Sequence, residues 1–171
     1  VRNSERRIRN LGFFSYVNSF PQSTLRADQY DLILDVEEQR TGAFNIGAGF
    51  SSIDQVVAFA ELSQGNFDIS NLRSFTGAGQ KMKVRVQGGT KRSDYELEFI
   101  EPWFLNRQLS LGVDLFQHES RYFSDEYDQR NRGFNVTLGK PLNSFDRINL
   151  TYGLEQVEIY NVPTNASELL I

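Results

Sequence analysis

The feature that most limits how this chain can fold is an alternation of apolar and polar side chains that recurs through Thr41–Val157. The clearest example is Lys81–Gln87, where a methionine and two valines alternate with lysine, arginine and glutamine. Successive side chains of a strand point to opposite faces of a sheet, so this period predicts strands with one apolar and one polar face. Because no helical period competes with it there, we predict a mainly β fold for this part of the chain.

Seven segments carry this alternation. They are Thr41–Phe50, Gln55–Ser63, Lys81–Gln87, Asp94–Ile100, Leu109–Leu115, Phe134–Leu138 and Arg147–Val157. The expected connections are short at Ser51–Asp54, long at Gln64–Ala78, short at Gly88–Ser93, intermediate at Glu101–Arg107, long at Gln117–Arg132 and short at Pro141–Asp146. Outer-membrane barrels have long loops on one side and short periplasmic turns on the other, and we expect that arrangement here.

The alternation alone fits both a soluble antiparallel sheet and a transmembrane β-barrel. Two features favour the barrel. The predicted strands reach about ten residues, against a usual length of about 5–6. Aromatic residues also lie near the strand ends, as at a membrane interface: Phe44, Tyr95, Phe99, Trp103, Phe104 and Tyr152. No apolar run approaches the roughly 18–20 residues that a membrane helix needs.

Composition argues against several other classes of protein. The net charge of -4 without a basic cluster argues against nucleic-acid binding, and the absence of cysteine excludes disulfides and thiolate metal sites. The single histidine, His118, leaves little room for a histidine metal site or a catalytic triad, and we interpret it as a solvated residue of the long Gln117–Arg132 loop. We expect no metal, no cofactor and no enzymatic activity.

An acidic group in the fourth predicted strand is the strongest enzymatic candidate. Glu96, Glu98 and Glu101 lie close in sequence, and paired carboxylates can hydrolyse glycosidic bonds. The favoured interpretation is structural, because a neighbouring strand carries lysines and an arginine that can pair with these carboxylates. Gly77–Gly79 precedes a strand rather than a helix, so it does not predict a phosphate-binding loop.

The first forty residues have a different pattern. We predict a helix at Asn3–Leu11, a strand at Phe13–Phe20, a loop at Pro21–Asp28 and a strand at Tyr30–Glu38. These elements are too few to bury a core alone, so we expect a packing partner on their N-terminal side. No apolar signal-peptide segment is present, and we expect any export signal to lie upstream. The predicted domain boundaries are 1–40 and 41–171.

Four stretches together resemble the BamA family of the bacterial surface antigen superfamily. ERRIRNLGFFSYV followed by YDLILDVEEQRTGAFNIGAGFSS is similar to the junction between the last POTRA domain and the barrel. GNFDISNLRSFTGAGQKMKV resembles a family loop in which Asn-Phe precedes Gly-x-Gly, here with a spacer lengthened by Asp68–Thr76. FIEPWFLNRQLSLGVDLF and YDQRNRGFNVTLGKPLNSFDRINLTYGLE resemble the strands that follow.

The resemblance implies a fold, a location and partners. Residues 1–40 would be the C-terminal half of an α+β POTRA domain in the periplasm, and residues 41–171 about seven strands of an antiparallel transmembrane β-barrel in the bacterial outer membrane. The implied function is assembly and insertion of outer-membrane β-barrel proteins. The implied partners are unfolded outer-membrane proteins, outer-membrane lipids and accessory assembly lipoproteins. A translocation pore of the two-partner-secretion type and a soluble ligand-binding β-domain remain alternatives.

The predicted site is the edge of the first barrel strand, which would template a client strand through its backbone. Its residues are Thr41, Gly42, Ala43, Phe44, Asn45, Ile46, Gly47, Ala48, Gly49 and Phe50. The glycines have two interpretations that are compatible with each other. They weaken the strand so that it can release a partner, or they make room for a group inside the barrel.

Overall fold

The computed structural model describes residues 2–25, 29–52, 54–124, 127–143 and 145–162. The chain divides into two compact units, Val1–Gly42 and Ala43–Ile171. No helix in the described ranges is long and apolar enough to cross a membrane.

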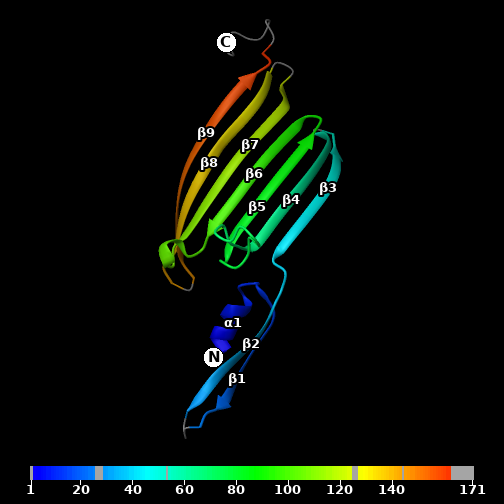
Figure 1. Ribbon diagram of the computed structural model, residues 1–171. Helices are drawn as coiled ribbons and strands as arrows, with labels where there is room; N and C mark the ends of the chain where they lie inside the picture. The colour runs from blue at the N-terminus through cyan, green and yellow to red at the C-terminus, as the bar shows by residue number, and fades with distance from the viewer. Residues whose placement is uncertain (1, 26–28, 53, 125–126, 144, 163–171) are drawn as a thin grey trace. The chain divides into compact units, whose positions relative to one another are not determined.

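The first unit is a helix beside a two-stranded antiparallel sheet (Figure 1). Its elements are α1 (Arg2–Arg9), β1 (Phe14–Ser23) and β2 (Tyr30–Glu38). Arg9 ties α1 to β1, because its Nη2 donates to the carbonyl oxygen of Val17 at 2.9 Å and to Glu5 Oε1 at 2.8 Å. The Ser19 hydroxyl donates to the other oxygen of Glu5 at 3.1 Å.

The predicted end of the first strand at Phe20 is wrong. β1 continues to Ser23, and Pro21 lies opposite Leu32 in the pair. Proline cannot donate a backbone hydrogen bond, but β1 pairs with only one strand. The position without an N–H can therefore face away from β2. The predicted helix is confirmed with its bounds shifted toward the N-terminus. Part of the predicted Pro21–Asp28 loop, residues 26–28, lies outside the described residues.

The second unit is one antiparallel sheet in which every strand pairs with its neighbours in sequence. Its elements are β3 (Gly42–Ser51), β4 (Gln55–Phe67), β5 (Gln80–Gly89), β6 (Arg92–Glu101), the short 3-10 helix η1 (Phe104–Asn106), β7 (Ser110–Ser124), β8 (Tyr127–Pro141) and β9 (Arg147–Tyr160). All seven predicted strands are present, at 10 to 15 residues each. Among the described residues the sheet does not close on itself, since β3 and β9 are its two edges.

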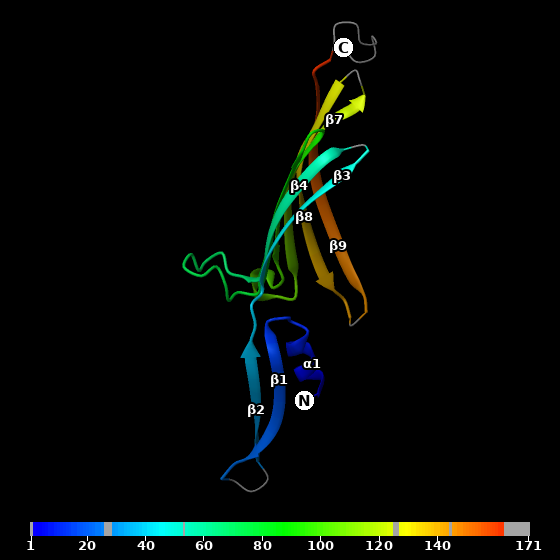
Figure 2. The same cartoon turned by 90° about the vertical axis from the view of Figure 1, so that its right-hand side faces the viewer.

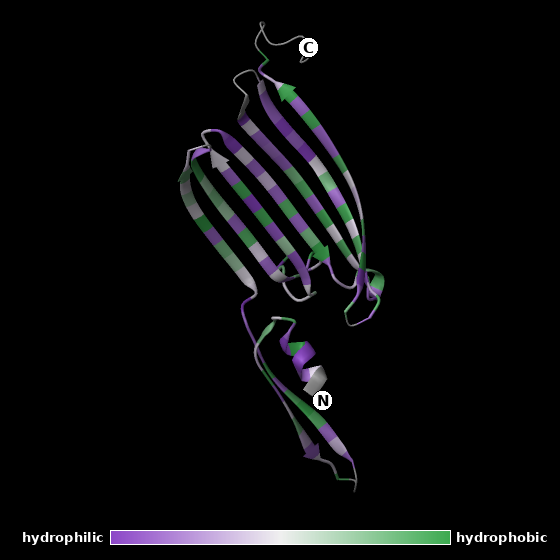
Figure 3. Cartoon of the chain, turned by 180° about the vertical axis from the view of Figure 1, so that it is seen from behind, coloured by the Kyte–Doolittle hydropathy of each residue, from purple (hydrophilic) through white to green (hydrophobic). Residues whose placement is uncertain are grey.

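The cross-strand register sorts the side chains onto two faces. Val84 lies opposite Leu97, which lies opposite Leu115, and this series defines the apolar face. Lys83 lies opposite Glu98, and this series defines the polar face. Figure 3 shows the resulting alternation of hydrophilic and hydrophobic residues along the strands. Much of the apolar face is exposed to solvent in the isolated chain, with Leu150 at 69%.

The prediction of a long loop at Gln117–Arg132 is wrong. β7 continues to Ser124, β8 begins at Tyr127, and these two residues pair. The period in hydropathy disappears here because both faces become polar. Pairing continues nonetheless, and Glu119, opposite Arg130, forms an ion pair with it at 3.1 Å. His118 is correspondingly a strand residue rather than a solvated loop residue.

The remaining connections have the predicted relative lengths. We call the end of the sheet where β3 begins the proximal end and the other end the distal end. At the distal end only residues 90–91 join β5 to β6, and β7 meets β8 at Ser124. The two longer connections, residues 68–79 and 102–109, lie at the proximal end and correspond to the connections predicted to be long and intermediate.

Candidate functional site at the edge of β3

β3 is an edge strand in this chain. One of its sides pairs with β4, and no described strand pairs with the other. An edge of this kind presents a row of N–H and C=O groups that can pair with a further strand. Of the predicted site residues, Thr41 immediately precedes β3, and all the others lie within it.

The side chains of β3 alternate between the two faces. On the apolar face, Phe44, Ile46 and Phe50 are 66%, 72% and 79% exposed. On the polar face, Asn45 Nδ2 donates to Glu61 Oε1 of β4 at 3.3 Å. The distal end of the strand is closed by Ser51, whose hydroxyl accepts from the backbone N–H of Asp54 at 2.8 Å.

The two glycines at the centre of β3 differ in their surroundings. A Cβ atom on Gly47 would lie 2.5 Å from Cε1 of the Phe59 ring, so this glycine makes room for an aromatic side chain of β4. A Cβ atom on Gly49 would have nothing within 4 Å. Packing therefore explains the absence of a side chain at Gly47 but not at Gly49.

Phe59 is held in turn by Arg85 of β5. The Cζ atom of Arg85 lies 4.9 Å from the Phe59 ring centroid, within the range of a cation–π interaction. The same guanidinium lies 3.6 Å from Glu61 Oε2 and donates to Gln87 Oε1 at 3.2 Å. Sequence reasoning missed Phe59 and Arg85 as neighbours of the site. An aromatic residue on the polar face, in the strand next to one that carries an arginine, was the available signal.

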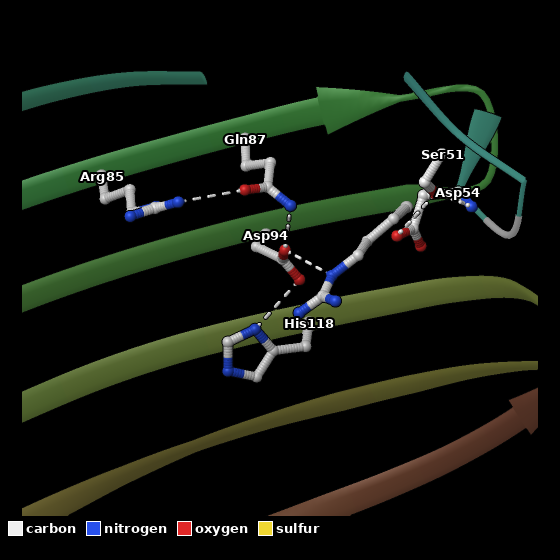
Figure 4. A network of polar contacts seen from close by, with 7 residues as sticks. Ser51, Asp54, Arg85, Gln87, Asp94 and His118 are labelled. Atoms are coloured by element: carbon white, nitrogen blue, oxygen red, sulfur yellow. Dashed lines mark hydrogen bonds and ion pairs between the residues drawn. The ribbon is translucent and has the colours of Figure 1, made fainter. Parts of the chain in front are cut away.

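The polar contacts continue from Gln87 across the sheet (Figure 4). Gln87 Nε2 donates to Asp94 Oδ2 at 3.0 Å, and Arg92 Nε donates to the same oxygen at 2.6 Å. His118 Nδ1 lies 3.0 Å from Asp94 Oδ1, and Asp94 is only 4% exposed. Side chains thus cross-link the polar face of β4–β7. The strand β4, which pairs with β3, is therefore held to the rest of the sheet by side-chain contacts as well as by its backbone.

The acidic group of β6 does not converge on one site. Lys83 Nζ pairs with Glu98 Oε2 at 2.5 Å, in agreement with the structural interpretation of this carboxylate. Glu101 lies on the opposite face, where it accepts from Gln80 Nε2 and from the backbone N–H of Trp103, both at 2.9 Å. Among the described residues no group of three or more acidic or histidine side chains could hold a metal ion.

Comparison with known proteins gives consistent matches. A family model described as the Omp85 superfamily domain matches residues 74–170, more than half of the chain. The outer membrane protein assembly factor BamA of Nitratidesulfovibrio vulgaris is 24% identical over 170 residues, which cover 99% of this chain and 20% of that protein. The corresponding protein of Neisseria meningitidis is 24% identical over 166 residues, covering 93% and 20%.

A solved structure agrees with the fold. The crystal structure of BamA from Haemophilus ducreyi lacking POTRA domains 1-3 matches with a TM-score of 0.72 and 25% identity, over 94% of this chain and 30% of that chain. The chain spans about a fifth of the length of the BamA relatives named above. These matches confirm the resemblance predicted from the sequence, and the chain belongs to the Omp85 superfamily as a BamA-like member.

Proposed function

We propose that this chain is part of an outer-membrane protein assembly factor and that β3 templates the strands of client β-barrels. The observation that carries the proposal is that β3 is an edge strand: one of its sides pairs with β4, and no described strand pairs with the other. An incoming strand can form main-chain hydrogen bonds there without any rearrangement of β4. This is the mode of recognition by strand addition.

The location proposed is the bacterial outer membrane. The apolar face of the sheet would contact lipid, and the polar face would line the interior of a barrel that other strands complete. The unit formed by residues 1–42 would be the C-terminal half of a POTRA domain in the periplasm. Unfolded outer-membrane proteins are the proposed clients, and accessory lipoproteins are further proposed partners. We also propose that the chain is not an enzyme, since Glu98 is engaged by Lys83.

The differing surroundings of the two glycines support the idea of an edge that can pair and release. Gly49 makes no packing contact that requires a glycine, and glycine weakens a strand because it adds backbone freedom. The neighbouring strand β4, in contrast, is tied to β5 by Arg85. Client exchange would therefore disturb β3 more easily than the rest of the sheet.

Cysteine cross-linking in the full-length protein tests this proposal. A cysteine at Ile46 in β3 is expected to form a disulfide with a cysteine in the edge strand of a stalled client. A matched cysteine at Leu97 in β6 is expected to form none, because β6 is paired on both sides. Absence of client adducts at every position of Thr41–Phe50 would contradict the proposal.

A further inference from the structure

The connection between β4 and β5, residues 68–79, folds over the apolar face at the proximal end. The ring of Phe75 stacks on Phe67 at 5.8 Å with an interplanar angle of 6°. Phe67 in turn meets the edge of Phe99, a residue of the apolar face, at 6.3 Å. Phe67 is 9% exposed, and Gln80 beside it is 8% exposed. The two views of Figures 1 and 2 show the connection projecting from the convex side of the sheet.

Hydrogen bonds hold this connection in a defined shape. Asp68 and Phe75 are joined by a backbone hydrogen bond of 3.0 Å, and Phe75 N–H donates to the Asn71 carbonyl at 2.8 Å. Asn66 closes the base, where its side-chain oxygen accepts from Gly79 N–H at 2.8 Å. The backbone N–H of Ile69 donates to Gln80 Oε1 at 2.9 Å. The shape therefore does not depend on an external partner.

The same connection displays large apolar side chains to solvent. Ile69 is 56%, Leu72 76% and Phe75 45% exposed, and the exposed Arg73 lies next to Leu72 in the chain. A rigid loop that keeps apolar groups in water forgoes the free energy of burying them.

We propose that the 68–76 segment of this connection is an anchor that inserts into the headgroup region of the phospholipid leaflet at the proximal end. This inference rests on the proposed function, in which the apolar face contacts lipid. Two observations select lipid as the occupant. The patch is continuous with the apolar face through the Phe75–Phe67–Phe99 stack, and it lies on the convex side where lipid would be. Apolar side chains beside a cation suit the boundary between acyl chains and phosphates.

The test uses the full-length protein with single cysteines that carry an environment-sensitive fluorophore. The protein is reconstituted alone in phosphatidylethanolamine–phosphatidylglycerol vesicles that contain lipids with a nitroxide either near the headgroup or near the acyl-chain terminus. Labels are placed at Leu72 in the loop, at Leu150 on the apolar face, and at Thr151 on the polar face. Leu72 is 76% exposed, so its replacement removes little packing.

The label at Leu72 is expected to be quenched about twofold more by the nitroxide near the headgroup than by the deep one, because interfacial groups lie at this depth. The label at Leu150 is expected to show the reverse preference, and the label at Thr151 to be quenched by neither. Quenching at Leu150 without quenching at Leu72 overturns the anchor and leaves the proposed function standing. Loss of quenching at Leu150 contradicts the membrane placement itself.

Two further outcomes identify a different occupant of the loop, and each overturns the proposal. Shielding at Leu72 that increases with the ratio of protein to lipid, without nitroxide quenching, indicates a second copy of the chain. Shielding at Leu72 that appears only after addition of an accessory lipoprotein indicates a protein partner. Variants are first checked for the heat-modifiable electrophoretic mobility of a folded barrel, so that loss of folding is not read as loss of lipid contact.

Discussion

Replacing Leu150 with arginine is expected to destabilise the folded protein in a bilayer by about 2–4 kcal/mol, the cost of a cation near the middle of the lipid-facing surface of a barrel. Along β9 the apolar face runs through Ile148, Leu150, Tyr152 and Leu154 before Gln156 interrupts it, so Leu150 occupies one of the two central positions. Urea unfolding of the protein in lipid vesicles measures the change.

The neighbouring residue supplies the matched control. Thr151 lies on the polar face, where its hydroxyl is 3.0 Å from that of Thr137. The Thr151→Arg variant places the same charge one residue away in the same strand but toward the barrel interior. We expect it to cost less than about 1 kcal/mol. Water can solvate a charge on the polar face, and the substitution removes only one hydroxyl hydrogen bond. Equal costs for the two variants would show that the apolar face does not contact lipid.

The second large effect is expected at Gly133 of β8. A Cβ atom there would collide with the carbonyl oxygen of Leu154 and would lie 2.9 Å from Phe116 Cζ and 3.0 Å from the Cα atom of Glu155. Two of these atoms are backbone atoms of β9, which cannot move without breaking the pairing of β8 with β9. We expect Gly133→Val to destabilise the fold by about 1–3 kcal/mol, the usual cost of overpacking.

Gly112 of β7 is the matched control for this substitution. It also lies on the polar face, but a Cβ atom there would meet only Thr137 atoms at 3.7 and 3.8 Å, an ordinary contact distance. Valine raises strand propensity at both positions, so the difference between the two variants isolates the collision. Unfolding midpoints measured in the same vesicles are expected to fall for Gly133→Val only. Similar midpoints for both variants would contradict the close approach of β8 and β9.

Much of the sheet could be predicted from the sequence, because side chains in a half-apolar strand repeat with period two. Lys81–Gln87 illustrates this, and the structure places Lys83 opposite Glu98 and Arg85 opposite Glu96 as predicted, while Lys81 lies opposite Ile100. The period failed at Gln117–Arg132, where polar residues occupy both faces and the pairing is carried by the backbone and by ion pairs such as Glu119–Arg130. Hydropathy cannot distinguish such a strand from a polar loop.

The position of the strand β3 was predictable from the sequence, but its side-chain contacts were not. The change from a charged segment to a glycine-rich strand marked Thr41–Phe50, and the structure places nine of these ten residues in β3. The close approach of the Phe59 ring to Gly47 depends on cross-strand register, which a single sequence does not specify. The stack of Phe75 on Phe67 likewise depends on a loop path that no local pattern encodes.

A proline scan of Ala43–Phe50 in the full-length protein tests the templating role of β3 most directly. Backbone N–H groups of successive strand residues point to opposite edges, so every second position donates away from β4. At those positions proline spares the pairing with β4 and removes only a donor to an incoming strand. The rate at which the reconstituted protein folds a client barrel into vesicles is the readout.

Proline variants that remain folded are expected to fold the client about tenfold more slowly, because each leaves a client carbonyl without its backbone donor at a cost of about 1–3 kcal/mol. Proline at the intervening positions is expected to impair folding of the protein itself. Folded proline variants that assemble the client at the wild-type rate would contradict strand templating at β3.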